Sequence, residues 1–254
     1  MQSKGGPRRA RQASPRALAI GGAVAAAIVL VIVLAIVLSS GGGAIKASSL
    51  PTNGSLASGL PGAGDVNTMF KGIPQKGLTL GSAFAPVTLV EYIDLQCPFC
   101  QTFETQVFPS IVEKYVRTGK LRVIVRPLDF LGPDSTRGRN AMIAAGVQNK
   151  AFDFSEILYD NQGTENTGWL DDSMIVQAAA SIPGLNPRLL YSQRNNSFVR
   201  QQASDYDAQQ AADKVNSTPT LFVGKTGTKG KVVSLASATD EASLVKAIDA
   251  ALGV

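Results

Sequence analysis

Two cysteines, Cys97 and Cys100, lie where a strand-forming run gives way to a helix-forming run, and they are the only cysteines in the chain. Residues 87–94 (VTLVEYID) are apolar and β-branched over the length expected of a buried strand. After the cysteines, apolar side chains recur at helical spacing, at Phe103, Val107, Ile111 and Tyr115. Pro98 suits the first helical position, where its missing N–H group costs nothing, and Pro109 predicts a kink. The sequence therefore predicts a cysteine pair at the start of a helix that follows a buried strand.

The rest of the folded part also alternates between strand and helix patterns. Residues 121–128 (LRVIVRPL) predict a second strand, parallel to the first because a helical crossover connects them. Residues from about 134 to 214 contain several helical stretches and little strand character, which predicts a helical insertion. Residues 220–223 and 232–236 predict a β-hairpin, and a last helix ends at Leu252. The pattern indicates an α/β fold.

Charge and composition exclude several classes of function. The net charge of +5 is local, because residues 1–17 carry five of the 24 basic side chains, and the remaining 19 equal the 19 acidic ones. A nucleic-acid-binding surface is therefore not expected. The chain has no histidine, which excludes histidine triads, histidine-ligated metals and catalysis by imidazole.

The N-terminal region predicts a membrane anchor. Residues 18–38 form a run of 21 residues without a charge, long enough to cross the hydrocarbon core of a bilayer. The alternative is a cleaved secretory signal, but the run is longer than a usual signal core and no clean A-x-A site follows it. With the basic residues 1–17 in the cytoplasm, we expect this helix to cross the membrane once and the C-terminal domain to lie outside the cytoplasm. Residues 39–75, rich in Gly, Ser, Ala and Pro, predict a flexible linker.

A C-x-x-C pair at a helix start has distinctive chemistry. The first sulfur lies near backbone N–H groups that stabilise a thiolate, so we expect Cys97 to be the reactive thiol. Cys100, one turn further in, should be better shielded and able to form a disulfide with Cys97. Two alternatives are a zinc half-site, for which only carboxylates could supply the missing ligands, and a structural disulfide, which gains little from so short a loop. A strand-to-helix position in an exported chain favours thiol–disulfide exchange.

Together, three features resemble one protein family. They are EYIDLQCPFCQTFE around the cysteines, VNSTPTLFVG at residues 215–224, and the intervening helices. They resemble the DsbA-like thiol:disulfide oxidoreductases, in their membrane-tethered, BdbD-like form, over residues 76–252. The resemblance implies a thioredoxin fold with a helical domain inserted at about residues 134–214, preceded here by the transmembrane helix. It implies no bound cofactor and no metal.

The resemblance also implies roles for single residues. Cys97 would be the nucleophile and Cys100 the buried resolving cysteine. Thr218 and Pro219 match the family's cis-proline loop, which lies beside the active site and pairs with the bound polypeptide. Pro98 belongs to the same substrate-binding surface. Phe99 stands where the strongest oxidants of the family have histidine, so we expect a less depressed Cys97 pKa and a milder oxidant, with the ring free to contact apolar substrate segments.

Two acidic residues match acidic positions of the family. Glu91, six residues before Cys97, corresponds to a buried acid thought to assist proton transfer, and Glu104, seven residues after Cys97, to another acid. A carboxyl group beneath the dithiol could relay protons if burial raised its pKa. The alternative for Glu104 is a solvated charge on a helix surface.

The function expected from these features is the introduction of disulfides into exported, unfolded polypeptides that carry cysteine thiols. The resemblance implies reoxidation by a quinone-linked membrane partner of the DsbB or VKOR kind. Two alternatives remain. One is a reductase or isomerase of exported proteins, because sequence does not set the redox direction. The other is a tethered polypeptide-binding module whose cysteines are incidental.

Overall fold

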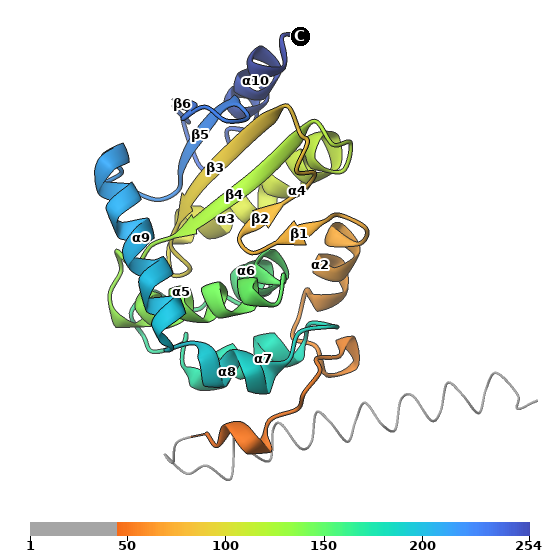
Figure 1. Cartoon of the computed structure of the whole chain (residues 1–254), viewed down its shortest axis with the longest axis vertical. Helices are drawn as coiled ribbons and strands as arrows, with labels where there is room; N and C mark the ends of the chain where they lie inside the picture. Colours follow the sequence, from red (N-terminus) through yellow and green to blue (C-terminus); the bar gives the residue numbers. More distant parts are fainter. Residues whose placement is uncertain (1–44) are drawn as a thin grey trace, which may run out of the picture.

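The structure is a computed structural model that describes residues 45–254 (Figure 1). The expected cytoplasmic tail (residues 1–17) and the expected transmembrane helix (residues 18–38) lie outside these residues. Among the residues that are described, no helix combines the length and the hydropathy needed to cross a membrane.

A mixed sheet of six strands forms the centre of the fold, in the order β1-β2-β4-β3-β5-β6. The central strand β3 (Val87–Ile93) is buried along its whole length, as its continuous apolar sequence predicts. It pairs in parallel with β4 (Leu121–Pro127), with Val87 opposite Leu121, which confirms the predicted crossover. Its other neighbour, β5 (Thr220–Lys225), is antiparallel. A short β6 (Lys231–Val232) completes the predicted hairpin.

The crossover between β3 and β4 is helical and broken once. It consists of α3 (Pro98–Gln106), α4 (Phe108–Ile111) and a π-helical turn, η3 (Val112–Val116). The break at Val107 lies two residues before Pro109, where the missing N–H group was expected to disturb the helix. In Figure 1, α3 and α4 lie behind the sheet, on the face that α10 (Glu241–Leu252) also covers through its contacts with β5 and β3.

Five helices separate β4 from β5, in agreement with the helical insertion predicted from the sequence. They are α5 (Pro133–Val147), α6 (Ala151–Asp160), α7 (Asp172–Ala180), α8 (Pro187–Gln193) and α9 (Ser197–Asp213). Most of them gather below the sheet in Figure 1, and α9 rises along one side to return the chain to β5. Asn186 caps α8 by accepting a hydrogen bond from the N–H group of Leu189.

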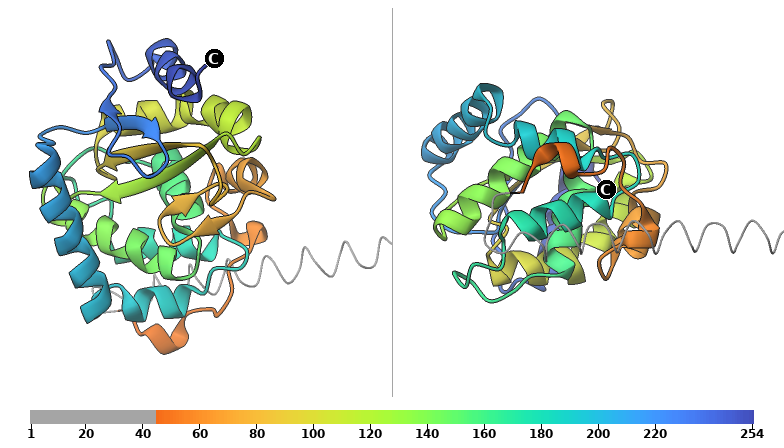
Figure 2. Two further views of the ribbon diagram at one scale, coloured as in Figure 1. Left: turned by 45° about the horizontal axis from the view of Figure 1, so that its top comes forward. Right: turned by 90° about the horizontal axis from the view of Figure 1, so that it is seen from below.

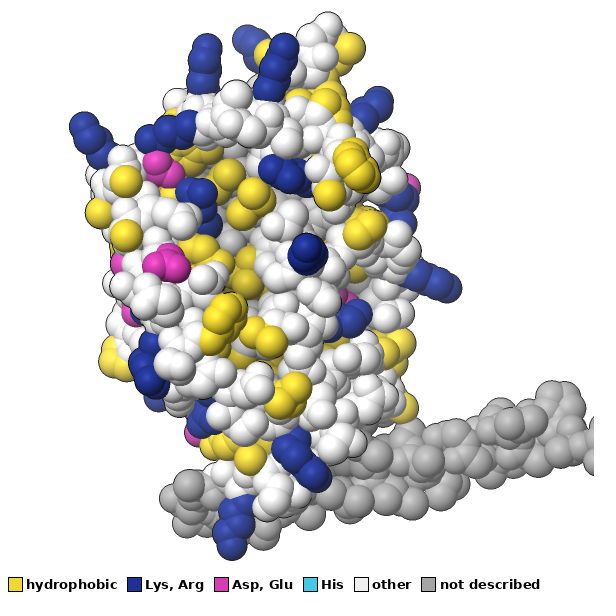
Figure 3. Space-filling model, in the orientation of Figure 1, with side chains coloured by type: hydrophobic (Ala, Val, Ile, Leu, Met, Phe, Trp, Pro, Cys, Tyr) yellow, Lys and Arg dark blue, Asp and Glu magenta, His cyan; other side chains and the backbone are white. Residues whose placement is uncertain are grey.

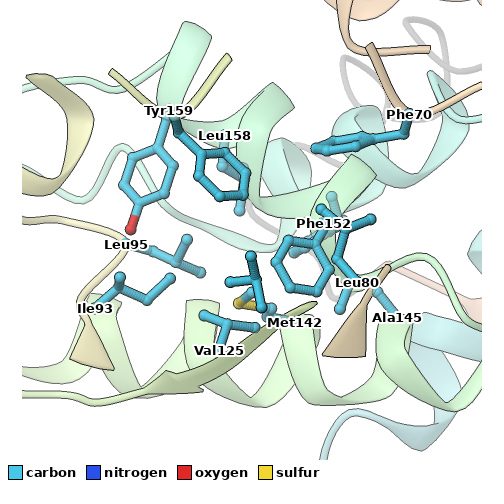
Figure 4. Close-up of a cluster of buried hydrophobic side chains, with 14 of the residues drawn as sticks. Phe70, Leu80, Ile93, Leu95, Val125, Met142, Ala145, Phe152, Leu158 and Tyr159 are labelled. Carbon is cyan, nitrogen blue, oxygen red and sulfur yellow. The ribbon is translucent and has the colours of Figure 1, made fainter. Parts of the chain in front are cut away.

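One apolar core joins the sheet to the inserted helices. Figure 4 shows side chains of β3 and β4, among them Ile93 and Val125, facing Met142 of α5 and Phe152 of α6. Because the core is continuous across this boundary, the insertion and the sheet support each other.

The expectation of a flexible linker over residues 39–75 is wrong for residues 45–75, which fold onto the insertion. This segment contains η1 (Ala47–Ser49), η2 (Leu56–Ser58) and α2 (Ala63–Phe70). Leu50 is 1% exposed and packs with Val176 and Tyr191 of α7 and α8. The ring of Phe70 meets that of Phe152 edge-on, with centroids 6.2 Å apart. Single large apolar residues anchor the segment, although its average composition is that of a spacer.

The strand pair at the start of the sheet was not predicted. β1 (Gln75–Lys76) and β2 (Thr79–Leu80) have two residues each, too few to show any periodicity. Gly77 between them adopts φ 60°, the left-handed region that glycine tolerates best. β2 pairs with β4, with Leu80 opposite Val123, so this hairpin extends the sheet beyond the predicted thioredoxin strands.

Candidate active site

The two cysteines lie at the start of α3, where the chain leaves the carboxyl end of β3. Cys97 is the N-cap residue, and its Sγ accepts a hydrogen bond from the backbone N–H group of Cys100 at 3.4 Å. Pro98 occupies the first turn, as predicted. The first sulfur thus meets the free amides of a helix N-terminus, where a thiolate is stabilised. Both cysteines are present as free thiols.

The loop before Pro219 provides the second contact of Cys97. The Cys97 thiol donates to the carbonyl oxygen of Thr218 at 3.3 Å, and the Thr218–Pro219 peptide bond is cis. The structure therefore brings together the cysteine motif and a loop that lies more than a hundred residues further along the chain. This juxtaposition agrees with the cis-proline loop that the resemblance implied.

The two thiols have opposite acidities. A hydrogen bond from the Cys100 thiol, together with hydrogen bonds from the side chain of Thr218 and from the backbone N–H groups of Cys100 and Phe99, outweighs burial and lowers the pKa of Cys97 to about 6. Burial, followed by the neighbouring Cys97 sulfur, raises the pKa of Cys100 well above its ordinary value. At neutral pH the site therefore holds a Cys97 thiolate beside a protonated Cys100.

The two cysteines also differ in their solvent exposure. Cys97 is 4% exposed and Cys100 is fully buried, so an incoming sulfur atom can reach only Cys97. Pro98 is exposed, and Phe99 is 66% exposed, the largest apolar surface next to the dithiol. Pro98 and Phe99 follow Cys97 directly, and Thr218 contacts it, so the predicted substrate-binding residues lie next to the reactive sulfur; their role in binding a substrate stays a prediction.

The loop between β3 and α3 is held by a network that the sequence did not reveal. Asp94 is fully buried and accepts hydrogen bonds from the N–H group of Gln96 at 2.9 Å and from the hydroxyl group of Ser135 at 2.6 Å. The side chain of Gln96 donates to Ser135 as well, and Tyr159 donates to the carbonyl oxygen of Asp94. These contacts tie the loop to α5 and α6, so the insertion positions Cys97.

Glu91 and Glu104 are both buried, on β3 and α3 respectively, with 1% and 2% of their surfaces exposed. The alternative of a solvated Glu104 is therefore wrong. One carboxyl oxygen of each has no hydrogen-bond partner among the described residues. Burial, and secondarily the charge of Glu104, raises the pKa of Glu91 well above its usual range.

A third buried acid, Glu156 of α6, was missed by the sequence analysis. It is 4% exposed, and its carboxyl group shares a hydrogen bond with that of Glu104. Burial raises the pKa of Glu104 and of Glu156 well above the ordinary value for glutamate. The available signal was the sequence around it, because Glu156 lies within the apolar run FDFSEILY, which leaves a helix no solvated face.

Comparison with known proteins places this geometry in a family. A family model described as thioredoxin matches residues 74–250. A probable disulfide bond formation protein D from Bacillus cereus is 26% identical over 160 residues, which are 62% of this chain and 73% of that protein. A Na⁺/H⁺ antiporter NhaA 1 from Mycolicibacterium gilvum is 30% identical over 185 residues, which are 71% of this chain but 27% of that protein.

Solved structures share the fold. Oxidised BdbD from Bacillus subtilis superposes with a TM-score of 0.63 at 22% identity, covering 72% of this chain and 98% of that one. The chain therefore belongs to the thioredoxin family, as a DsbA-like oxidoreductase.

Proposed function

We propose that this protein is an extracytoplasmic thiol:disulfide oxidoreductase that introduces disulfides into exported proteins through Cys97 and Cys100. The observation that carries the proposal is the pair of unequal thiols at the N-terminus of α3, with Cys97 bounded by Thr218 of the cis-proline loop. The relative from Bacillus cereus, a probable disulfide bond formation protein D, supports the same direction.

The exchange proceeds in two displacements. In the oxidised enzyme a substrate thiolate attacks Cys97 Sγ, the Cys97–Cys100 bond breaks, and Cys100 leaves and takes up a proton. A second substrate thiolate then attacks the substrate sulfur of the mixed disulfide and expels Cys97 as a thiolate. The substrate loses two electrons and the dithiol gains them. The low pKa of Cys97 favours this leaving group, and the high pKa of Cys100 favours its uptake of the proton.

The acidity of Cys97 sets the strength of the oxidant. Its pKa of about 6 lies between the values near 7 for thioredoxin and near 3.5 for DsbA. Stabilising the thiolate stabilises the reduced form and raises the reduction potential. A protein of this acidity is therefore an oxidant milder than DsbA, as the phenylalanine at position 99 also predicts.

Glu91 and Glu104 are proposed to hold and pass the proton that Cys100 gains and loses. Their burial in the same interior as the resolving cysteine supports this role, because a raised pKa keeps a carboxyl group protonated at neutral pH. Neither residue is hydrogen-bonded to the reacting sulfur atoms, so we assign them to proton supply rather than to nucleophilic catalysis.

The proposed surroundings follow from the N-terminal sequence. Residues 1–17 are the cytoplasmic tail, residues 18–38 the membrane span, and the DsbA-like domain, with its insertion at about 134–214, lies outside. The clients are unfolded exported polypeptides, and a quinone-linked membrane protein of the DsbB or VKOR kind restores the disulfide. No bound cofactor takes part.

The test is oxidation of a reduced, unfolded substrate by the full chain. Cys97→Ala should abolish oxidation. Cys100→Ala, with Cys97 first converted by oxidised glutathione to a mixed disulfide, should exchange with the thiolate of a single-cysteine substrate peptide, release glutathione and hold the peptide on Cys97. Undiminished oxidation by Cys97→Ala would defeat the assignment of Cys97 as the catalytic thiol. A wild-type chain that binds the unfolded substrate without oxidising it would support a polypeptide-binding module. Equilibration with glutathione then sets the direction, because a potential near −270 mV indicates a reductase and one near −120 mV a strong oxidant.

A further inference from the structure

The sheet face opposite α3 contains a hollow of about 330 Å³. Alternate residues of β3 point to the two faces, so Thr88 and Val90 line this hollow while Glu91 belongs to the interior next to the active-site helix. No helix crosses in front of β3 and β4 in Figure 1, and Figure 2 shows α9 at one edge of the sheet. The hollow is therefore separate from the dithiol.

The floor of the hollow is apolar and its rim is cationic. Val90, Ile124 and Phe222 form the floor, and the cationic groups on the rim are Arg122, Arg126 and Lys229. Figure 3 views this face and shows hydrophobic surface between Lys and Arg side chains on the upper half of the molecule.

Arg122 is held in one orientation by a chain of hydroxyl groups. Its Nε donates to Thr88 Oγ1 at 2.9 Å, Thr88 Oγ1 lies 2.8 Å from Thr226 Oγ1, and Thr226 Oγ1 donates to the carbonyl oxygen of Ala85 at 2.7 Å. The bond to Ala85 uses the single hydroxyl hydrogen of Thr226, so Thr226 must accept a hydrogen bond from Thr88. The hydroxyl hydrogen of Thr88 is then used as well, so Thr88 accepts from Arg122. The Nε–H group of Arg122 thereby has its hydrogen-bond partner. The two terminal nitrogens of the guanidinium group form a pair of donors, called here the Arg122 fork.

The charges of the rim do not cancel. Asp213 is bound by Arg126 at 3.1 Å and by Lys229 at 2.7 Å, and Tyr92 donates to it at 2.6 Å. Among the described residues, Arg122 has no carboxylate partner. Three cationic side chains thus face one carboxylate, and the cation without a counter-charge is the one whose orientation is fixed.

We propose that this hollow binds a small amphipathic anion, with its carboxylate or phosphate group on the Arg122 fork and its apolar body on Val90, Ile124 and Phe222. An oriented guanidinium group matches the two oxygens of such an anion in a bidentate pair. The volume lies at the lower end of the range for small-molecule sites, about 300–1,000 Å³, and suits a body the size of one ring. The site requires no thiol chemistry and stands independently of the proposed function.

The probes are phenyl phosphate and benzoate, with benzyl alcohol as the uncharged control. Calorimetric titration of the full chain in nanodiscs of zwitterionic lipid should show saturable binding of both anions and none of benzyl alcohol. Anionic lipid in the nanodiscs should displace phenyl phosphate if a lipid headgroup is the natural source, and leave it bound if the source is a free anion; either source satisfies the proposal.

Three variants separate an oriented site from general attraction of anions. Arg122→Gln should weaken binding about tenfold or more, because it removes a charged hydrogen-bonding fork. Thr88→Val keeps every charge but removes the hydroxyl that orients Arg122, and should weaken binding about threefold or more. Lys231→Gln removes an exposed lysine of β6 that does not line the hollow, and should leave binding unchanged.

Three results would overturn the proposal. They are the absence of saturable binding by the wild-type chain, unchanged binding by Arg122→Gln, and a loss in Lys231→Gln as large as that in Arg122→Gln. Circular dichroism and thermal unfolding serve as the check that each variant is folded, so that the test does not depend on the proposed thiol chemistry.

Discussion

The carboxyl groups of Glu104 and Glu156 share a hydrogen bond in the interior between α3 and α6. One of the two must carry a proton to donate it, because two ionised carboxylates only repel each other. The charged groups around the pair are acidic as well, including Glu91, Asp153 and Asp160. The buried face of α3 is thus packed against carboxyl groups whose pKa values are raised by burial.

Glu156→Gln should change how stability depends on pH. Burial raises the folded-state pKa of Glu156 above its ordinary value of 4.5, so the folded state loses stability as pH rises above that value. Glutamine keeps a hydrogen bond to Glu104 and cannot ionise. We expect the free energy of unfolding of the variant to increase relative to that of the wild type as pH rises from about 5 to 8. The difference should reach about 1 kcal/mol or more at pH 8.

Urea unfolding at several pH values measures this gain as the difference between variant and wild type, so that the titration of Cys97 cancels. Glu113→Gln is the matched control, because the Glu113 side chain is 70% exposed and pairs with Arg117 on the surface. A stability difference that stays constant over the pH range would contradict a shared buried proton.

The thiol of Cys97 should ionise well below a free cysteine. Alkylation by iodoacetamide, followed as a function of pH, should show a midpoint near pH 6 in the reduced protein. Cys100 should stay unreactive over the same range because it is buried and its pKa is raised. A midpoint near that of a free thiol, about 8.5, would remove the basis for an oxidising dithiol.

Cys100→Ala should raise the pKa of Cys97. The hydrogen bond from the Cys100 thiol is the largest contribution that stabilises the Cys97 thiolate, and alanine cannot supply it. Only Cys97 can be alkylated in this variant, so its pH profile is read directly. An unchanged midpoint would show that the backbone N–H groups of the helix terminus suffice alone.

Phe99→His should make the protein a stronger oxidant. A histidine at this position adds a cationic or hydrogen-bonding group beside the Cys97 thiolate, which lowers the pKa of Cys97. A tenfold stabilisation of the reduced form raises the potential by about 30 mV. Equilibration with glutathione measures the change, with Phe99→Leu as the uncharged control that should leave the potential close to wild type.

Leu50→Ala should destabilise the domain by about 2–4 kcal/mol. Leu50 is 1% exposed against Val176 and Tyr191, and shortening a buried leucine removes apolar contacts and leaves a cavity. Leu56→Ala is the control, because Leu56 is 41% exposed. Thermal unfolding compares the two, and equal, small effects would restore the interpretation of this segment as a spacer.

The parts of the fold predicted from sequence were those with a local cause. The buried run of β3, the cysteines at a helix start and Pro109 at a helix break all follow from side chains within one turn or strand. The proximity of Thr218 to Cys97 was expected only through the resemblance, since nothing local links two residues so far apart in the chain.

The parts that escaped prediction depend on tertiary packing. Leu50 and Phe70 lie among Gly, Ser and Pro residues, whose composition indicates a linker until the complementary surface of the insertion is known. Glu156 was missed for a different reason. The apolar side chains beside it indicate a buried helix, and nothing in the local pattern marks the one acid among them as functional. The Arg122 fork needs three strand-end hydroxyl and carbonyl groups that only the folded sheet brings together.

The 4% of its surface that Cys97 keeps open limits which proteins it can serve. A cysteine in the rigid surface of a folded protein cannot bring its sulfur atom into contact with so little exposed surface. A cysteine in a flexible, unfolded segment can. For the proposed function, this means that the folding state of a polypeptide, rather than its sequence, would decide whether it is oxidised.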